Sequence, residues 1–221
     1  MQTVVIADDH ALHRKAYRNY IESTGNYVVI AEATDGLQLL FTLQQLTALP
    51  NIAFIDLKMP IIDGIAAIDI INYLYPTIKC VGFSQYTQPN IIVDVLMAGA
   101  KGFLQKGFEE EIENLYNALQ KEEIFVTSNQ RNALQFYKEC FKCSQVINPA
   151  IGTLTKKEIL FLKLIANGLS YEDISKLLFI SISTLNNHQA NIKHKTGFAD
   201  KQQQTLFAQQ SGIAKSLRFN N

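Results

Sequence analysis

Residues 52–56 have the sequence Ile52-Ala53-Phe54-Ile55-Asp56, in which four apolar residues are followed directly by a carboxylate. A short apolar run without alternation is typical of a strand that is buried on both faces, as in the parallel sheets of α/β proteins. The run Val4-Val5-Ile6 near the N-terminus has the same character. We therefore expect every strand of this sheet to be buried on both faces.

The pattern of short apolar runs and longer amphipathic stretches extends from Met1 to about Lys121. It predicts an α/β fold with a doubly wound, five-stranded parallel sheet that is covered by helices. The expected strands are residues 3–7, 27–33, 52–55, 78–83 and 102–104. The expected helices are residues 12–23, 36–47, 64–74, 89–98 and 108–121.

Residues 122–150 show no strand pattern, but apolar residues recur there at helical spacing and predict a linker helix that is closed by Asn148-Pro149. The apolar positions are Ala133, Leu134, Phe136, Tyr137, Cys140 and Phe141. Such a stripe packs either on a neighbouring domain or on a second copy of the chain. We accordingly divide the chain into a first domain at residues 1–121, a linker at 122–150 and a second domain at 151–221.

The second domain is expected to be all-α, with four short helices joined by short turns. Thr155 and Glu158 form a capping-box pattern that opens the first helix, which ends at Asn167-Gly168. The other three helices are expected to begin at Ser170, at either Ser181 or Ser183, and at Asp200. This arrangement is typical of a helix-turn-helix domain.

The composition is that of a globular protein with an uneven charge distribution. The 221 residues suffice for two hydrophobic cores, and 48% apolar and 18% charged residues exclude disorder over the whole length. Residues 1–128 hold eight Lys/Arg and 15 Asp/Glu, a net charge of −7, whereas residues 151–221 hold nine and four, a net charge of +5. The acidic part suggests a site for a cation or a phosphoryl group, and the basic part suggests a polyanionic partner.

The sequence indicates a cytoplasmic protein without a membrane partner. No apolar run approaches the roughly 18 residues of a membrane span, and the N-terminal strand is followed by two acids, unlike a signal peptide. Three cysteines, an odd number, fit a reducing compartment. Cys140 and Cys143 form a C-x-x-C motif, but no second pair or nearby histidine completes a zinc site, so we interpret them as thiols on the linker helix.

Carboxylates follow two of the expected strands: Asp8 and Asp9 follow the first, and Asp56 follows the third. The carboxyl ends of the central strands of a doubly wound sheet meet at one edge, so these acids should converge there. Converging carboxylates repel unless a cation lies between them, and oxygen ligands suit Mg²⁺; the alternative is that each acid only caps a helix. Ser84 after the fourth strand and Lys106 after the fifth should face the same pocket, where a phosphoryl group would find both partners.

Residues 1–121 resemble the flavodoxin-like receiver domain of two-component response regulators. The resemblance rests on Asp8-Asp9, Asp56-Leu57-Lys58-Met59-Pro60, Asp63-Gly64, Ser84 and Gly102-Phe103-Leu104-Gln105-Lys106. It implies that Asp56 accepts a phosphoryl group from a sensor histidine kinase or a small phosphodonor. An activity beyond Mg²⁺-dependent self-phosphorylation and dephosphorylation at Asp56 is not implied, so the chain is not expected to be a metabolic enzyme.

The same resemblance assigns roles to the residues around Asp56. It implies that Mg²⁺ is held by Asp8, Asp9, Asp56 and the backbone carbonyl of Lys58. It further implies that Lys106 pairs with the phosphoryl oxygens, that Ser84 hydrogen-bonds them and that Phe103 is an aromatic switch that follows Ser84 inward. His10, which follows the acid pair, is interpreted as structural rather than catalytic.

The second domain resembles the LuxR-type helix-turn-helix, which makes the whole chain similar to NarL/FixJ-type response regulators. The matching stretches are Leu154–Ser170, Ile180–His188 and Asn191–Phe198. The expected DNA contacts come from Ser183, Thr184, Asn186, Asn187, His188, Lys193 and Lys195, with Leu185 and Ile192 facing inward. The family usually has lysine at Asn186, so phosphate attraction is reduced here, although asparagine can still bond adenine edges.

These features predict a transcriptional regulator whose phosphorylation favours a homodimer that binds paired half-sites on double-stranded DNA. One alternative is a receiver protein that acts through protein contacts, with weakened or lost DNA binding, which the departure at Asn186 favours. A second alternative is a DNA binder that is independent of phosphorylation. The intact set of Asp8, Asp9, Asp56, Ser84 and Lys106 argues against the second alternative.

Overall fold

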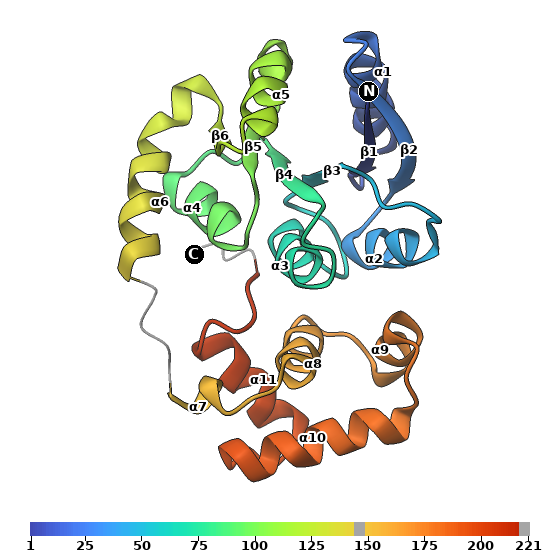
Figure 1. Ribbon diagram of the computed structural model, residues 1–221, viewed down its shortest axis with the longest axis vertical. Helices are drawn as coiled ribbons and strands as arrows, with labels where there is room; N and C mark the ends of the chain where they lie inside the picture. Colours follow the sequence, from blue (N-terminus) through green and yellow to red (C-terminus); the bar gives the residue numbers. More distant parts are fainter. Residues whose placement is uncertain (144–148, 217–221) are drawn as a thin grey trace. The chain divides into compact units, whose positions relative to one another are not determined.

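The computed structural model describes residues 1–143 and 149–216, so Asn148, where the linker helix was expected to close, lies outside the described residues. The chain divides into two compact units, one formed mainly by residues 1–142 and the other by residues 143–215 (Figure 1). The division falls inside the linker expected at residues 122–150. The domain boundaries at 121 and 150 stay a prediction.

Within the described residues, the first unit is a six-stranded parallel sheet with helices on both faces (Figure 1). The strands are β1 (Gln2–Ala7), β2 (Tyr27–Ala33), β3 (Ile52–Asp56), β4 (Lys79–Ser84), β5 (Gly102–Gln105) and β6 (Phe125–Val126), in the order β2-β1-β3-β4-β5-β6. One face is covered by α1 (Ala11–Ser23) and α5 (Ile112–Gln120), the other by α2 (Gly36–Gln45), α3 (Gly64–Leu74) and α4 (Pro89–Met97) (Figure 1). The doubly wound α/β fold predicted from the apolar runs is confirmed.

The centre of the sheet is buried because helices cover both of its faces. Residues 4–7 of β1 and 52–55 of β3 are at most 1% exposed, as their continuous apolar runs predict. On one face of the sheet, the ring of Phe54 packs edge to face against those of Tyr27 and Phe83, with centroid distances of 6.2 and 6.3 Å. The strand ends that follow these runs are therefore held by a close-packed core.

Among the described residues, the sheet has six strands rather than the five expected. The sixth, β6, follows residue 121, where the sequence shows no strand pattern. β6 consists of Phe125 and Val126 alone, which is too short to show a period in the sequence. It is defined by parallel pairing with β5. The pairing continues at Thr127, whose N–H donates to the carbonyl of Phe103 at 3.1 Å and whose Oγ1 accepts the N–H of Gln105 at 2.8 Å.

The expectation that every strand is buried on both faces is wrong for β2. This strand lies at the edge of the sheet, and its Ile30 is 39% exposed. Glu32 of β2 accepts hydrogen bonds from Arg14 Nε at 3.0 Å and Arg18 Nη1 at 2.9 Å. An edge strand has one strand neighbour only, and α1 lies against it with charged side chains, so the apolar content of β2 overstates its burial.

The loop between β3 and α3 brings the helix close to Asp56. A Cβ atom added at Gly64 would collide with the carbonyl oxygen of Asp56, so this close approach requires glycine. Asp63 caps α3 by accepting the N–H of Ala66 at 3.0 Å. In the same loop, Ile61 has φ +66° and is 68% exposed. A left-handed conformation costs a non-glycine residue about 1–2 kcal/mol, and a β-branched side chain is especially unsuited to it.

We predict that Ile61→Gly raises the free energy of unfolding of the first unit by about 1 kcal/mol. Glycine removes the strain at φ +66° and loses little buried surface, while its greater freedom in the unfolded chain offsets part of the gain. The matched control is Ile62→Gly, because Ile62 is 1% exposed and its removal should destabilise by about 3 kcal/mol or more. Urea denaturation of both variants measures the effect, and an Ile61→Gly variant that is no more stable than the parent contradicts the prediction.

Helix α6 (Arg131–Cys143) confirms the helix expected between the two domains. Its apolar stripe is only partly covered: Ala133 is 1% exposed, whereas Phe136 is 57% exposed and Cys140 is exposed. The side chains of Phe141 and Cys143 lie outside the described residues. Among the described side chains, burial of the stripe is thus strongest in the first turn of the helix.

The second unit is entirely helical among its described residues. It contains α7 (Pro149–Gly152), α8 (Lys156–Ala166), α9 (Tyr171–Leu178), α10 (Ile182–Thr196) and α11 (Lys201–Gln210). The four expected helices are confirmed as α8 to α11, and α7 is an additional short helix. Ser181, rather than Ser183, caps α10, since its Oγ accepts the N–H of Thr184 at 3.1 Å. Helix α8 contacts α9, α10 and α11 and buries Phe161 and Leu164 completely.

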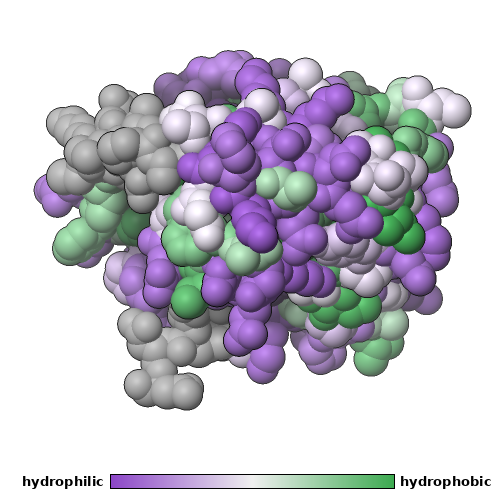
Figure 2. All heavy atoms as spheres, turned by 90° about the horizontal axis from the view of Figure 1, so that it is seen from below, coloured by the Kyte–Doolittle hydropathy of each residue, from purple (hydrophilic) through white to green (hydrophobic). Residues whose placement is uncertain are grey.

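The helices of both units are short and mostly amphipathic. The longest in the described part of the chain, α10, has 15 residues. No helix within residues 1–143 and 149–216 combines the length and the apolar character that a bilayer crossing needs. Figure 2 shows one face of the molecule, on which most of the coloured residues are hydrophilic.

Candidate functional site

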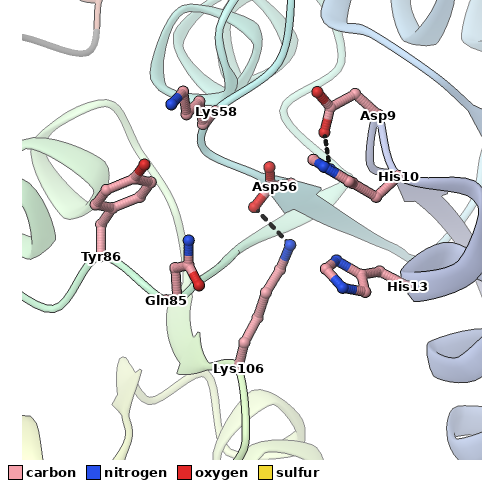
Figure 3. Close-up of a pocket in the computed structure, with 8 residues that line it drawn as sticks. All are labelled: Asp9, His10, His13, Asp56, Lys58, Gln85, Tyr86 and Lys106. Carbon is pink, nitrogen blue, oxygen red and sulfur yellow. Dashed lines mark hydrogen bonds and ion pairs between the residues drawn. The ribbon is translucent and has the colours of Figure 1, made fainter.

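Side chains from the carboxyl ends of three parallel strands converge at one edge of the sheet. Asp8 follows β1 and is fully buried, Asp56 ends β3 and is 6% exposed, and Lys106 follows β5. The Nζ atom of Lys106 lies 2.8 Å from Oδ1 of Asp56 (Figure 3). The same Nζ atom lies 2.8 Å from Oδ2 of Asp8. One ammonium group therefore bridges two buried carboxylates that come from different strands.

Asp8 and Asp9 are held differently. Oδ1 of Asp8 accepts the backbone N–H of His10 at 2.8 Å, and the Asp8 carbonyl accepts a hydrogen bond from Arg14 Nη1 at 2.7 Å. The Asp9 side chain is 30% exposed, and its Oδ1 lies 2.7 Å from Nδ1 of His10 (Figure 3). Asp8 is thus a rigid, buried carboxylate, and Asp9 is one that solvent can reach. Sequence reasoning missed Arg14, because no local pattern links an arginine on a helix to the backbone of the preceding strand end.

Burial dominates the electrostatics of the site. It raises the pKa of Asp56 above the ordinary aspartate value, the charges of Asp8 and Asp9 add to the rise, and the ion pair with Lys106 only partly offsets it. Burial by itself lowers the pKa of Lys106, but the ion pairs with Asp56 and Asp8 outweigh it and raise that pKa. Lys106 is therefore charged at neutral pH, whereas ionisation of Asp56 costs free energy.

A pocket of about 290 Å³ opens over Asp56. It is lined by Asp9, His10, His13, Asp56, Lys58, Gln85, Tyr86 and Lys106 (Figure 3). The sequence analysis did not single out His13 or Gln85, since neither forms part of a chemical pattern. Only the fold brings the first turn of α1 and the loop after β4 to the same pocket.

Two of the predicted site residues lie beneath the surface. Ser84 is fully buried, its Oγ accepts the N–H of Tyr86 at 3.2 Å, and its carbonyl accepts the N–H of Lys106 at 2.9 Å. Phe103 is also fully buried, on β5. Lys58 is exposed, with its Nζ 6.0 Å from the ring centroid of Tyr86. The backbone between β4 and β5 thus ties Ser84 directly to Lys106.

The donor set fits a hard divalent cation. Asp8, Asp9 and Asp56 supply carboxylate oxygens, the ligands that Mg²⁺ prefers. The ammonium of Lys106 balances only one of these three negative charges, and repulsion from Asp8 and Asp9 adds to the rise that burial causes in the pKa of Asp56. The alternative that these acids only cap helices does not account for the ion pairs of Asp8 and Asp56 with Lys106.

We predict that Asp56→Asn stabilises the first unit in metal-free buffer at neutral pH. The folded-state pKa of Asp56 lies above its ordinary value of 3.8, so its ionisation costs stability, and the cost grows as pH rises through the folded pKa. The melting temperature of the variant should exceed that of the parent at pH 7, and the difference should shrink below pH 4. Lys106→Met is the control and should lower the melting temperature, because it leaves buried carboxylates unpaired. Equal melting temperatures of the parent and Asp56→Asn at pH 7 contradict the prediction.

In the second unit, α10 has a buried face and a polar face. Leu185 and Ile192 are fully buried, which confirms the predicted inward stripe. The side chains of Ser183, Asn186, Asn187 and Lys193 are exposed, and those of Thr184 and His188 are half-buried. The exposed face of α10 therefore carries amide, hydroxyl and ammonium groups of the kind that read DNA bases and phosphates.

Lys195, a further predicted DNA contact, has a partner within the unit. Its Nζ lies 2.7 Å from Oε2 of Glu158, which is 2% exposed and also accepts the N–H of Thr155 at 2.7 Å. Burial raises the pKa of Glu158, but the hydrogen bonds from Lys195 and Thr155 outweigh it and lower that pKa. The ion pair joins α10 to the start of α8. The DNA contact of Lys195 stays a prediction.

Two family models match the chain. The response regulator receiver domain matches residues 4–120, more than half of the chain, and the luxR family of bacterial regulatory proteins matches residues 152–208. The uncharacterised transcriptional regulatory protein YxjL of Bacillus subtilis (strain 168) is 31% identical over 216 residues, which cover 96% of this chain and 97% of that protein.

Two solved structures of the response regulator RcsB are similar to the chain. One, of two RcsB dimers bound to two parallel DNAs, has 26% identity and a TM-score of 0.55, and the match covers 95% of this chain and 98% of that one. The other, the isolated receiver domain of RcsB from Salmonella enterica serovar Typhimurium with the phosphomimetic BeF₃⁻, has 26% identity and a TM-score of 0.54, over 60% of this chain and 97% of that one. The chain belongs to the two-component response regulators that join a receiver domain to a LuxR-type DNA-binding domain, and it is a transcriptional regulator of that NarL/FixJ type.

Proposed function

We propose that Asp56 is the phosphoacceptor through which a sensor histidine kinase or a small phosphodonor controls this regulator. The observation that carries the proposal is the bridge of Lys106 to Asp56 and Asp8, which positions one cationic group at a buried carboxylate in an accessible pocket. Because Lys106 pairs with Oδ1 of Asp56, we assign the attack on phosphorus to Oδ2. Lys106 then pairs with a phosphoryl oxygen and offsets the charge that develops there.

Asp8, Asp9 and Asp56 would hold Mg²⁺, with the backbone carbonyl of Lys58 as a further ligand. When bound, the ion supplies positive charge to the phosphoryl oxygens during transfer in both directions. The three carboxylates come from the ends of two neighbouring strands, β1 and β3. On this basis we propose that phosphorylation and dephosphorylation at Asp56 depend on Mg²⁺.

Ser84 and Phe103 would transmit the phosphorylated state. Ser84 is buried and its Oγ accepts the N–H of Tyr86, so a rotation of the hydroxyl toward a phosphoryl oxygen would exchange this hydrogen bond for one to the phosphoryl group. Phe103 lies on the strand that leads to Lys106 and packs in the core, where it would follow Ser84 inward. The pair would convert the charge at Asp56 into a change of the surface of the receiver.

We further propose that the receiver spans residues 1–121, that the linker of residues 122–150 adds β6 to the receiver sheet, and that the DNA-binding domain spans 151–221. We also propose that the protein works in the cytoplasm as a homodimer on double-stranded DNA. The family matches at 4–120 and 152–208 support the division. The solved complex of RcsB dimers with DNA supports the homodimer. The exposed face of α10 would contact the DNA through Ser183, Thr184, Asn186, Asn187, His188, Lys193 and Lys195.

Phosphorylation is tested with acetyl phosphate and Mg²⁺. Asp56→Asn should abolish the mobility shift in a phosphate-affinity gel, because it removes the nucleophile without changing the shape of the side chain. Asp9→Ala should weaken the dependence of labelling on Mg²⁺ concentration. Asp94→Asn, an exposed carboxylate on α4, is the matched control and should label like the parent. Labelling of Asp56→Asn to the parent level contradicts the assignment.

DNA binding is tested by titration at several salt concentrations. Asn186→Lys should tighten general DNA binding and steepen the slope of log affinity against log salt by about one unit, since each phosphate contact contributes roughly 0.9. Asn187→Ala should weaken a specific site by about 1–3 kcal/mol if it reads a base. Gln210→Lys adds the same charge at the end of α11 and should leave the slope nearly unchanged.

The same titration decides between DNA binding and the alternative of action through protein contacts. A phosphorylated parent that binds no DNA at any salt concentration, together with no effect of Asn187→Ala, favours the alternative. A steeper slope for Asn186→Lys but not for Gln210→Lys assigns the DNA-facing surface to α10.

A further inference from the structure

Two of the four histidines of the chain lie together at the entrance of the receiver pocket. His10 is the residue before α1, and His13 lies in the first turn of that helix. Their rings are stacked, with centroids 5.1 Å apart and an angle of 26° between the planes. Both side chains line the pocket over Asp56 (Figure 3). The receiver chemistry proposed above uses neither of these imidazoles.

The two imidazoles and Asp8 have the spacing of a metal-binding group. One ligand atom from each of Asp8, His10 and His13 lies within 4.8 Å of the other two. Ligand atoms around a tetrahedral zinc ion are about 3.3 to 3.6 Å apart, given metal–ligand distances of about 2.0 to 2.2 Å. Both histidines are exposed, so small rotations of their side chains bring the atoms to that spacing while Asp8 stays fixed.

A neighbouring carboxylate prepares His10 as a ligand. Oδ1 of Asp9 lies 2.7 Å from Nδ1 of His10 (Figure 3). A carboxylate at this distance favours the tautomer with the proton on Nδ1 and the lone pair on Nε2. Carboxylates that do not themselves bind the ion orient metal-binding histidines in this way. The pair of Asp9 and His10 therefore matches the carboxylate–histidine–metal arrangement.

We propose that Asp8, His10 and His13 form a site for Zn²⁺ that is distinct in its ligands from the all-oxygen site for Mg²⁺ but shares Asp8 with it. Imidazole nitrogens favour zinc over magnesium, whereas carboxylates alone favour magnesium. Zn²⁺ at this site would lie near the ammonium of Lys106, and the negative charges of Asp9 and Asp56 offset the repulsion between the two cations. Because both sites use Asp8 and bring two divalent ions close together, binding of one ion should weaken binding of the other.

The binding test uses the full chain with Cys140→Ser and Cys143→Ser, so that the C-x-x-C thiols do not compete for metal. Calorimetric titration with Zn²⁺ alone should give one ion per chain. His10→Asn and His13→Asn should each weaken binding about tenfold or more, since each removes one of three protein ligands. His194→Asn, an exposed histidine on α10, is the matched control and should bind like the parent. Unchanged zinc binding in His13→Asn, or an equal loss in His194→Asn, overturns the proposal.

Two further measurements do not depend on the folding of the variants or on the phosphorylation chemistry. In nuclear magnetic resonance spectra of the parent, Zn²⁺ should shift the ring protons of His10 and His13 but not those of His188 and His194. Zinc titration of the unphosphorylated parent needs no phosphodonor, so a failure of the zinc site is distinguishable from a failure of phosphorylation at Asp56. Millimolar Mg²⁺ should weaken the apparent zinc affinity, and an affinity independent of Mg²⁺ overturns the shared role of Asp8.

Discussion

The ion pairs of Lys106 with Asp8 and Asp56 are the interaction on which the receiver site depends. Each partner sits at the end of a different strand, so the ammonium group fixes the relative positions of β1, β3 and β5 where the pocket opens. Two buried carboxylates near one ammonium leave negative charge uncompensated, which a cation or a phosphoryl group with its metal would relieve. The charges of Asp8, Asp56 and Lys106 therefore both hold the strand ends together and favour binding of a cation or a phosphoryl group.

Much of this arrangement could be predicted from the sequence, because the residues that carry it are marked locally. Continuous apolar runs identify β1 and β3, and an acid directly after such a run must lie at the edge where parallel strands end. The capping box of Thr155 and Glu158 likewise marks the start of α8. The features that could not be predicted are those that tertiary contacts define. β6 has only two residues, and the half-buried state of β2 follows from its place at the edge of the sheet.

In the second unit, two lysines of α10 have different surroundings although they are close in sequence. Lys195 and Lys193 lie on the same helix, but Lys195 pairs with the buried Glu158 while Lys193 is exposed. Sequence spacing gives both residues the same expected role, because the partner of Lys195 lies 37 residues away on another helix. Counting lysines on α10 therefore overestimates the positive charge that is available to a polyanion.

The pairing of β6 with β5 also bears on how the receiver can be produced by itself. A fragment that stops at Lys121 lacks β6 and Thr127, and it exposes the backbone N–H and C=O groups along one side of β5. Unpaired strand edges recruit other chains, so we expect such a fragment to self-associate through the exposed edge of β5. A fragment that extends through Gln130 retains the covered edge and is the appropriate unit for isolated study.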